Sequence, residues 1–145
     1  MNDTRKPELV LLDRIVGDWH TSGTLNTGNG SLNIKGTDSY QWLPGGHFLM
    51  HTVDVMMGGD RKQSIEIIGF DILSGTYPMH FYDDQGESGV MHGSFIGDEW
   101  NIISPELRFK GHFSNNYNKL SGVWEHCTDN NWQHLMDIQL LRATL

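Results

Sequence analysis

The chain has 145 residues, a formal net charge of -8 at pH 7 and no run of Lys or Arg, which argues against binding to nucleic acid or to anionic membranes. No apolar stretch approaches the roughly 20 residues of a transmembrane helix, and the N-terminus lacks a signal-peptide pattern, so a cytoplasmic location is predicted. The single cysteine, Cys127, excludes an internal disulfide and a multi-cysteine metal site. This length fits one domain spanning residues 1–145.

A short helix is predicted near the start of the chain, over about residues 7–16. Pro7 suits the first helical turn, and Gly17 ends the helical pattern. Leu11 and Ile15 contribute to an apolar stripe between these two positions. The helical periodicity does not return after this point.

Short runs of alternating polar and apolar residues follow, and each gap between them is brief and rich in turn-forming residues. Neighbouring runs should therefore pair as antiparallel strands. About ten such strands close most simply into an up-and-down β-barrel over about residues 18–142, because closure removes exposed strand edges. A β-sandwich is the alternative. The expected strands cover residues 18–26, 31–42, 47–56, 64–72, 77–83, 89–96, 99–103, 107–114, 119–127 and 132–142.

The last two expected strands give the first indication of a site. Side chains alternate across a strand, so the apolar set of each strand should be the inward set. This alternation places two indoles and two imidazoles together inside the barrel: Trp124, His126, Trp132 and His134. A container with an aromatic and partly polar wall is therefore predicted.

The same alternation assigns further inward residues. Phe109 and Phe113 oppose polar neighbours on their strand, and Tyr40 and Trp42 share one face of another. Met136 continues the inward set of the last strand. His20 and His112 fall on outward positions and are expected at the surface.

Two strands leave their facing open. His51 lies on a strand with apolar residues on both faces, so the pattern does not decide whether it points inward. On the hairpin near residues 77–96, either His80, Tyr82 and His92 or a set of Met and Phe side chains lines the cavity. The second choice is favoured, because burying several large apolar side chains is worth about 1.5–3 kcal/mol each.

Several motifs, in their order and spacing, resemble a bacterial family of unassigned function within the calycin superfamily, beside lipocalins, fatty-acid-binding proteins and nitrobindins. The resemblance extends from Leu9 to about Arg142 and implies a barrel with a ligand cavity. The motifs are Gly17-Asp18-Trp19, Trp42-Leu43-Pro44-Gly45-Gly46-His47-Phe48-Leu49, Gly69-Phe70-Asp71, Ser74-Gly75-Thr76-Tyr77 and Phe81-Tyr82-Asp83.

Two further expectations come with the resemblance. In lipocalin-like barrels an Arg at the end of the last strand packs over the Trp that opens the first, which here implies a contact between Arg142 and Trp19. Nitrobindins bind haem through one His near the C-terminal end of the barrel, and His126 or His134 would be the analogous residue. Haem is a minor alternative, and no cofactor is predicted.

The leading hypothesis is that the barrel binds one small hydrophobic or aromatic molecule, oriented by inward His side chains. The predicted ligand-binding residues are Tyr40, Trp42, His51, Phe109, Phe113, Trp124, His126, Trp132, His134 and Met136.

The alternative is an isomerase, cyclase or hydratase in which His134, His126 or His51 moves a proton. A further alternative is haem or metal binding, although no metal-ligand spacing occurs and no metal residue is predicted. The expected partner is a small molecule rather than nucleic acid or a membrane, and a homodimer is left open.

Overall fold

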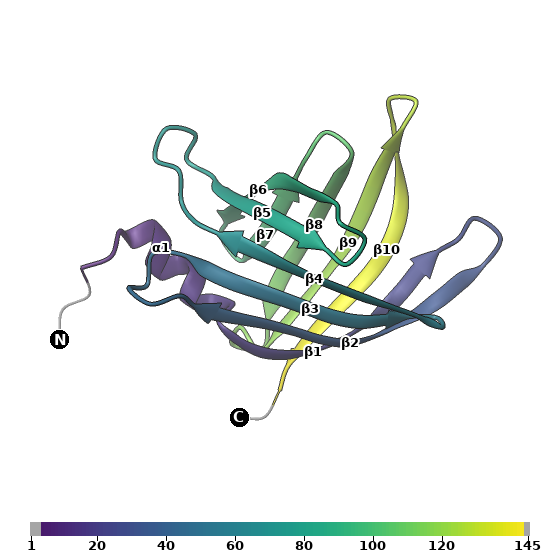
Figure 1. Cartoon of the computed structure of the whole chain (residues 1–145), viewed down its shortest axis with the longest axis horizontal. Helices are drawn as coiled ribbons and strands as arrows, with labels where there is room; N and C mark the ends of the chain where they lie inside the picture. Colours follow the sequence, from purple (N-terminus) through teal and green to yellow (C-terminus); the bar gives the residue numbers. More distant parts are fainter. Residues whose placement is uncertain (1–3, 144–145) are drawn as a thin grey trace.

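The structure, a computed structural model, describes residues 4–143. Ten strands of this part of the chain pair antiparallel with their sequence neighbours, and β1 pairs with β10, which closes the barrel (Figure 1). This arrangement confirms the predicted up-and-down barrel. The elements are α1 (Pro7–Leu11), a 3-10 turn (Leu12–Arg14), β1 (Gly17–Asn26), β2 (Ser31–Trp42), β3 (Leu49–Met57), β4 (Asp60–Ile68), β5 (Tyr77–Asp83), β6 (Ser88–Ile96), β7 (Glu99–Ile103), β8 (Leu107–Ser114), β9 (Lys119–Thr128) and β10 (Asn131–Arg142).

Several boundaries differ from the sequence-based expectation, among them the start of β3 at Leu49 rather than residue 47 and the end of β4 at Ile68 rather than residue 72. The α-helix ends at Leu11 and continues only as a 3-10 turn, so it is shorter than residues 7–16. Strand β4 begins at Asp60 rather than at residue 64, because Gly58 takes a left-handed conformation with φ 60° and returns the chain after two residues. The polar residues 60–63 therefore pair with β3 and form the first part of β4.

One end of the barrel, here called the closed end, is covered by α1 and the 3-10 turn (Figure 1). Leu12 and Ile15 from this cover are 0 % exposed, as is Trp19 at the start of β1. Trp100 on β7 completes this packed layer at 1 % exposure. The closed end is thus a hydrophobic core filled by side chains.

Arg142 and Trp19 make the contact implied by the lipocalin resemblance. The guanidinium carbon of Arg142 lies 4.2 Å from the centroid of the Trp19 ring. Its Nη1 donates to the carbonyl oxygen of Val16 at 2.5 Å, and its Nη2 donates to those of Arg14 at 2.9 Å and Tyr117 at 3.0 Å. One side chain therefore ties the first strand, the last strand and the helical cover together.

The opposite end, here called the open end, is packed differently. Many inward side chains in this half of the barrel are only half-buried, although their cross-strand partners show that they face the interior. Ile34 and Val55, on the same part of the inward wall, are buried at 2 % and 3 % exposure. Water therefore reaches the inward wall from this end. The half-buried inward side chains are Leu25, Val53, Met57, Phe81, Met91, Leu107, Trp124, Met136 and Ile138.

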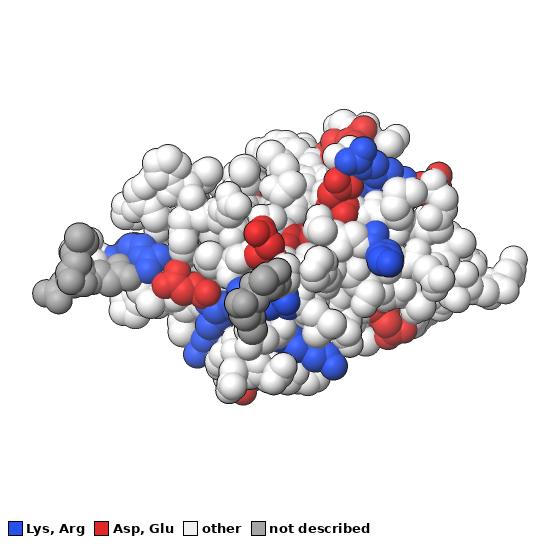
Figure 2. Space-filling model, turned by 90° about the horizontal axis from the view of Figure 1, so that it is seen from below, with Lys and Arg blue, Asp and Glu red and all other residues white. Residues whose placement is uncertain are grey.

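Charged side chains on the outer surface are mixed in sign. On the face shown in Figure 2, the basic side chains lie in several separate groups with acidic side chains between them. The helices of residues 4–143 include none with the length and apolar character needed to cross a membrane.

Candidate ligand-binding site

Four polar residues of the described chain are buried, and all of them point into the barrel from adjacent strands. Thr21 lies on β1, Asp38 on β2, His51 on β3 and Glu66 on β4, each at 5 to 7 % exposure. Tyr40, two residues after Asp38, is equally buried at 5 %. These five residues form one contiguous group, here called the polar floor, between the packed closed end and the accessible open half.

The polar floor is organised around the imidazole of His51. Its Nδ1 lies 2.6 Å from Glu66 Oε1, and its Nε2 lies 2.6 Å from Asp38 Oδ1. The hydroxyl of Thr21 donates to the other oxygen of Asp38. The ring of Tyr40 stacks on that of His51, with centroids 3.9 Å apart and planes within 8°. Neighbouring groups thus fix the imidazole on both ring nitrogens and on one face.

These contacts determine the charge of the floor. Burial alone would lower the pKa of His51, but the hydrogen bonds that it donates to Asp38 and Glu66 more than offset this effect and raise the pKa to about 9. His51 is therefore an imidazolium at neutral pH that donates from both nitrogens. Burial, and then the two carboxylate charges, raise the pKa of Tyr40, which remains a neutral phenol. Two carboxylates and one imidazolium leave a formal charge of about -1.

Two oxygen atoms of the floor have no hydrogen-bond partner within the described part of the chain. They are Glu66 Oε2 and the hydroxyl oxygen of Tyr40. Neither is sealed from solvent, because the only side-chain atom of residues 4–143 that is both sealed and unpartnered is Asn101 Oδ1. The acceptor and the hydroxyl therefore each keep a small accessible surface, although both residues are buried.

An aromatic wall on β8 and β9 faces the interior, with Phe109 buried in the core cluster and Trp124 half-buried. The rings of Phe109 and Trp124 are opposite one another in register, with centroids 5.1 Å apart. Gly111 and Gly122 make room for the Phe109 ring, since a Cβ at Gly122 would lie 2.4 Å from Phe109 Cζ. Met136 on β10 lies next to Trp124 and continues this wall.

The predicted inward positions of Trp132 and His134 are wrong. Strand β10 contains a β-bulge at Leu135, so His134 pairs with Glu125 and Met136 pairs with Trp124. One extra residue reverses the facing of every β10 side chain that precedes the bulge, because side chains alternate with a period of two.

Both displaced side chains have partners on the outer surface. Arg108 lies over the Trp132 ring at 4.2 Å and pairs with Glu125 at 2.7 Å. The Nε2 of His134 lies 3.1 Å from Asp137 Oδ2. Neither Trp132 nor His134 can therefore orient a molecule inside the barrel.

The other predicted residues divide by height along the barrel. Tyr40, His51, Phe109, Trp124 and Met136 face the interior, and of these only Trp124 and Met136 are half-buried. His126 also faces inward, opposite Leu107 and close to the open rim, and is half-buried.

Two inward residues belong instead to the closed end. Trp42 donates from Nε1 to Asp13 in the helical cover at 2.8 Å. Phe113 lies 6.5 Å from Trp19 between ring centroids. They support the barrel below the floor and do not line its accessible half.

The open question about the β5–β6 hairpin is settled by burial. Met79 is 1 % exposed and faces inward, whereas His80 and Tyr82 are exposed and His92 shares the outward side of its strand. The favoured assignment, with the Met and Phe face inside, is confirmed. These three polar residues are therefore not part of the interior wall.

Sequence reasoning missed three members of the floor: Thr21, Asp38 and Glu66. A signal for one of them was present, because Asp38 has the same strand parity as Tyr40 and Trp42, which were expected inside. A carboxylate on an apolar face is uncommon and marks a position that requires a buried partner.

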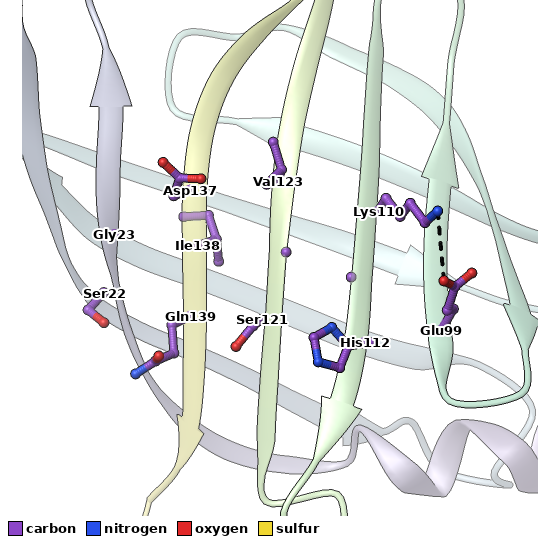
Figure 3. A pocket seen from close by; sticks show the side chains of 12 residues that line it. Ser22, Gly23, Glu99, Lys110, His112, Ser121, Val123, Asp137, Ile138 and Gln139 are labelled. Carbon is purple, nitrogen blue, oxygen red and sulfur yellow. Dashed lines mark ion pairs between the residues drawn. The ribbon is translucent and has the colours of Figure 1, made fainter.

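The outer wall carries a separate hollow of about 610 Å³ (Figure 3). Polar side chains of β1, β7, β8, β9 and β10 surround it, and Lys110 Nζ lies 3.8 Å from Glu99 Oε1 along one side. The side chain of Lys110 is 77 % exposed, and His112 and Asp137 are exposed as well. This hollow lacks the buried polar groups that distinguish the polar floor, so the interior is the stronger candidate site.

Metal and haem ligation depend on which ring nitrogens are free. No group of three or more His, Cys, Asp or Glu within residues 4–143 has an arrangement that could hold a metal ion. Haem iron takes a ring nitrogen, and both nitrogens of His51 are already engaged. His126 is the remaining inward candidate, and its ring makes no hydrogen bond within the described part of the chain. Haem binding would therefore depend on His126.

Fold and site together define a class of protein: a closed ten-stranded up-and-down β-barrel with a charged, hydrogen-bonded group in its interior. The chain belongs to the family described as "Protein of unknown function (DUF1579)", whose model matches residues 4–115. No curated protein matches the chain.

Among solved structures, the chain is similar to the crystal structure of Rv2717c from M. tuberculosis. The two share 15% sequence identity and superpose with a TM-score of 0.70, over 96% of this chain and 99% of that chain. At this level of identity the similarity supports the fold alone.

Proposed function

We propose that the protein binds one small molecule with an apolar or aromatic body in the open half of the barrel interior. The observation that carries this proposal is a set of large inward side chains toward the open end that are only half-buried, beside Ile34 and Val55, which are buried there. Inward residues at the closed end, such as Leu49 and Ile68, are 0 % exposed, whereas Trp124 and Met136 above the floor are half-buried. Large apolar side chains that face inward yet remain accessible are typical of a binding cavity.

The polar floor would fix the orientation of such a molecule. Apolar walls supply most of the binding free energy in small-molecule sites, and a few placed polar groups select the ligand and its direction. His51 would act here as a positioning residue, because its two hydrogen bonds hold Asp38 and Glu66 in place. A proton-transfer role for His51 is disfavoured, since neither ring nitrogen is free to meet a substrate.

The proposal can be tested by titration with N-phenylnaphthylamine, a neutral fluorophore that brightens in apolar sites. We expect saturable binding with one site per chain. Val53→Trp should weaken binding at least about tenfold, because Val53 faces the interior next to the floor and the added ring would occupy the cavity.

A matched control is Val123→Trp, which adds the same side chain to the outer hollow. We expect it to leave the affinity unchanged. Binding that is lost in the Val123 variant and kept in the Val53 variant would place the fluorophore outside and overturn the proposal. Thermal unfolding of both variants should establish that each remains folded.

A further inference from the structure

The polar floor has more negative charge than the protein compensates. Asp38 and Glu66 share the single imidazolium of His51, and neither forms an ion pair with Lys or Arg within the described part of the chain. Both carboxylates are nevertheless buried, at 7 % and 6 % exposure. A buried net charge is unfavourable unless a partner neutralises it.

Of the two buried carboxylates, only Glu66 has an oxygen without a hydrogen-bond partner in the described part of the chain. Asp38 uses one oxygen for His51 and the other for the hydroxyl of Thr21. Glu66 uses only Oε1, which leaves Oε2 as an acceptor with accessible surface on the inward wall. The hydroxyl of Tyr40, also unpartnered, belongs to the same floor. A positively charged hydrogen-bond donor would neutralise the excess negative charge and would also provide a partner for these oxygen atoms.

We infer that the molecule bound inside the barrel carries a cationic nitrogen, such as a primary ammonium, on its apolar body, and that Glu66 Oε2 receives it. This inference rests on the proposed interior binding and narrows its ligand class. The half-buried Trp124 favours the same ligand, because the face of an indole attracts a nearby cation as well as apolar groups. A carboxylate head would meet a floor of like charge and should be rejected.

Three probes of similar shape separate the head groups: phenylbutylamine, phenylbutanol and phenylbutyrate. Each is measured at neutral pH by its displacement of N-phenylnaphthylamine. We expect the amine to bind at least about tenfold more tightly than the alcohol, as a charge-assisted hydrogen bond would provide, and the carboxylate to bind most weakly. Equal affinity of the amine and the alcohol, or tighter binding of the carboxylate, would overturn the inference.

Glu66→Gln tests whether this residue is the acceptor. The amide keeps an oxygen for His51 but removes the charge, so the preference for the amine should fall to within about threefold. Glu87→Gln removes the same charge from an exposed position on the β5–β6 turn and should keep the preference. A preference that persists in Glu66→Gln would show that another group recognises the cation.

An NMR measurement on the wild-type protein covers the case in which the Glu66 variant fails to fold. The side-chain carboxyl carbon of Glu66 should shift on addition of phenylbutylamine and should not shift with phenylbutanol. An unchanged signal at saturating amine would contradict the assignment. Failure of N-phenylnaphthylamine and all three probes to bind would instead count against interior binding itself.

Discussion

His51 Nδ1 lies 2.6 Å from Glu66 Oε1 inside the barrel, on strands that are neighbours in the sheet. With Asp38 at 2.6 Å from the other ring nitrogen, the imidazole has no lone pair left to accept a proton from a substrate. The imidazole of His51 therefore holds two carboxylates in position. Its effect on the free energy of unfolding and on ligand affinity can be measured in separate experiments.

The first prediction concerns stability as a function of pH. The pKa of His51 in the folded protein, about 9, lies above its ordinary value of 6.5, so the folded state binds this proton more tightly. Its contribution is complete below about pH 6.5 and is lost as the pH rises through about 9. We expect the free energy of unfolding to fall by up to about 3 kcal/mol over this range in denaturant titrations.

NMR titration assigns this change to the correct residue. The His51 ring should remain protonated until about pH 9. His112→Asn should leave the pH dependence of stability in place. A His51 ring that loses its proton near neutral pH would contradict the described hydrogen bonds.

The second prediction compares two tryptophans that the alternation pattern alone does not distinguish. Trp124 faces the interior beside Phe109, whereas Trp132 lies outside under Arg108. Trp124→Ala should weaken N-phenylnaphthylamine binding about tenfold or more, because it removes a large apolar contact surface. Trp132→Ala should leave the affinity within about twofold. Equal losses in both variants would show that the β10 bulge is misplaced.

The third prediction concerns the closure of the barrel. Arg142→Lys keeps the charge but loses the fork of donors that reaches the carbonyl oxygens of Arg14, Val16 and Tyr117. We expect a loss of about 3 kcal/mol in the free energy of unfolding, since several acceptors lose their donor together. Arg61→Lys breaks the fork to Asp54 in an exposed pair, and should change stability by less than about 1 kcal/mol. Similar effects of the two substitutions would argue against a special role for Arg142.

The fourth prediction uses two glycines in different surroundings. A Cβ at Gly23 would lie 1.9 Å from the backbone oxygen of Asp137, because β1 and β10 approach closely there. Gly23→Ala should therefore cost about 3 kcal/mol or prevent folding. A Cβ at Gly30, in the β1–β2 turn, would meet nothing within 4 Å, so Gly30→Ala should be nearly neutral in thermal unfolding. A stable Gly23 variant would mean that these strands are further apart than described.

Strand alternation was sufficient to predict the barrel and much of its inward wall. Phe109, Trp124 and Met136 face the interior because their strands keep a strict period of two at these positions. The pattern failed at Trp132 and His134, where the bulge at Leu135 inserts one residue. No Gly marks this bulge, so composition gave no local signal for it.

Prediction from strand alternation had two other limits, and both have physical causes. Alternation gives the face of a residue but not its height in the barrel, and so Trp42 and Phe113 were grouped with the cavity although they pack at the closed end. The polar floor depends on contacts between β1, β2, β3 and β4 that no short motif encodes. Asp38, His51 and Glu66 become one group only when these strands pair in register.

The most direct test of interior binding is a crystal structure of the protein grown with saturating phenylbutylamine. The proposal predicts density for the phenyl ring beside Phe109 and Trp124, with the ammonium within hydrogen-bonding distance of Glu66 Oε2. An interior that contains only protein side chains and water, or a probe located in the outer hollow beside Lys110, would contradict it.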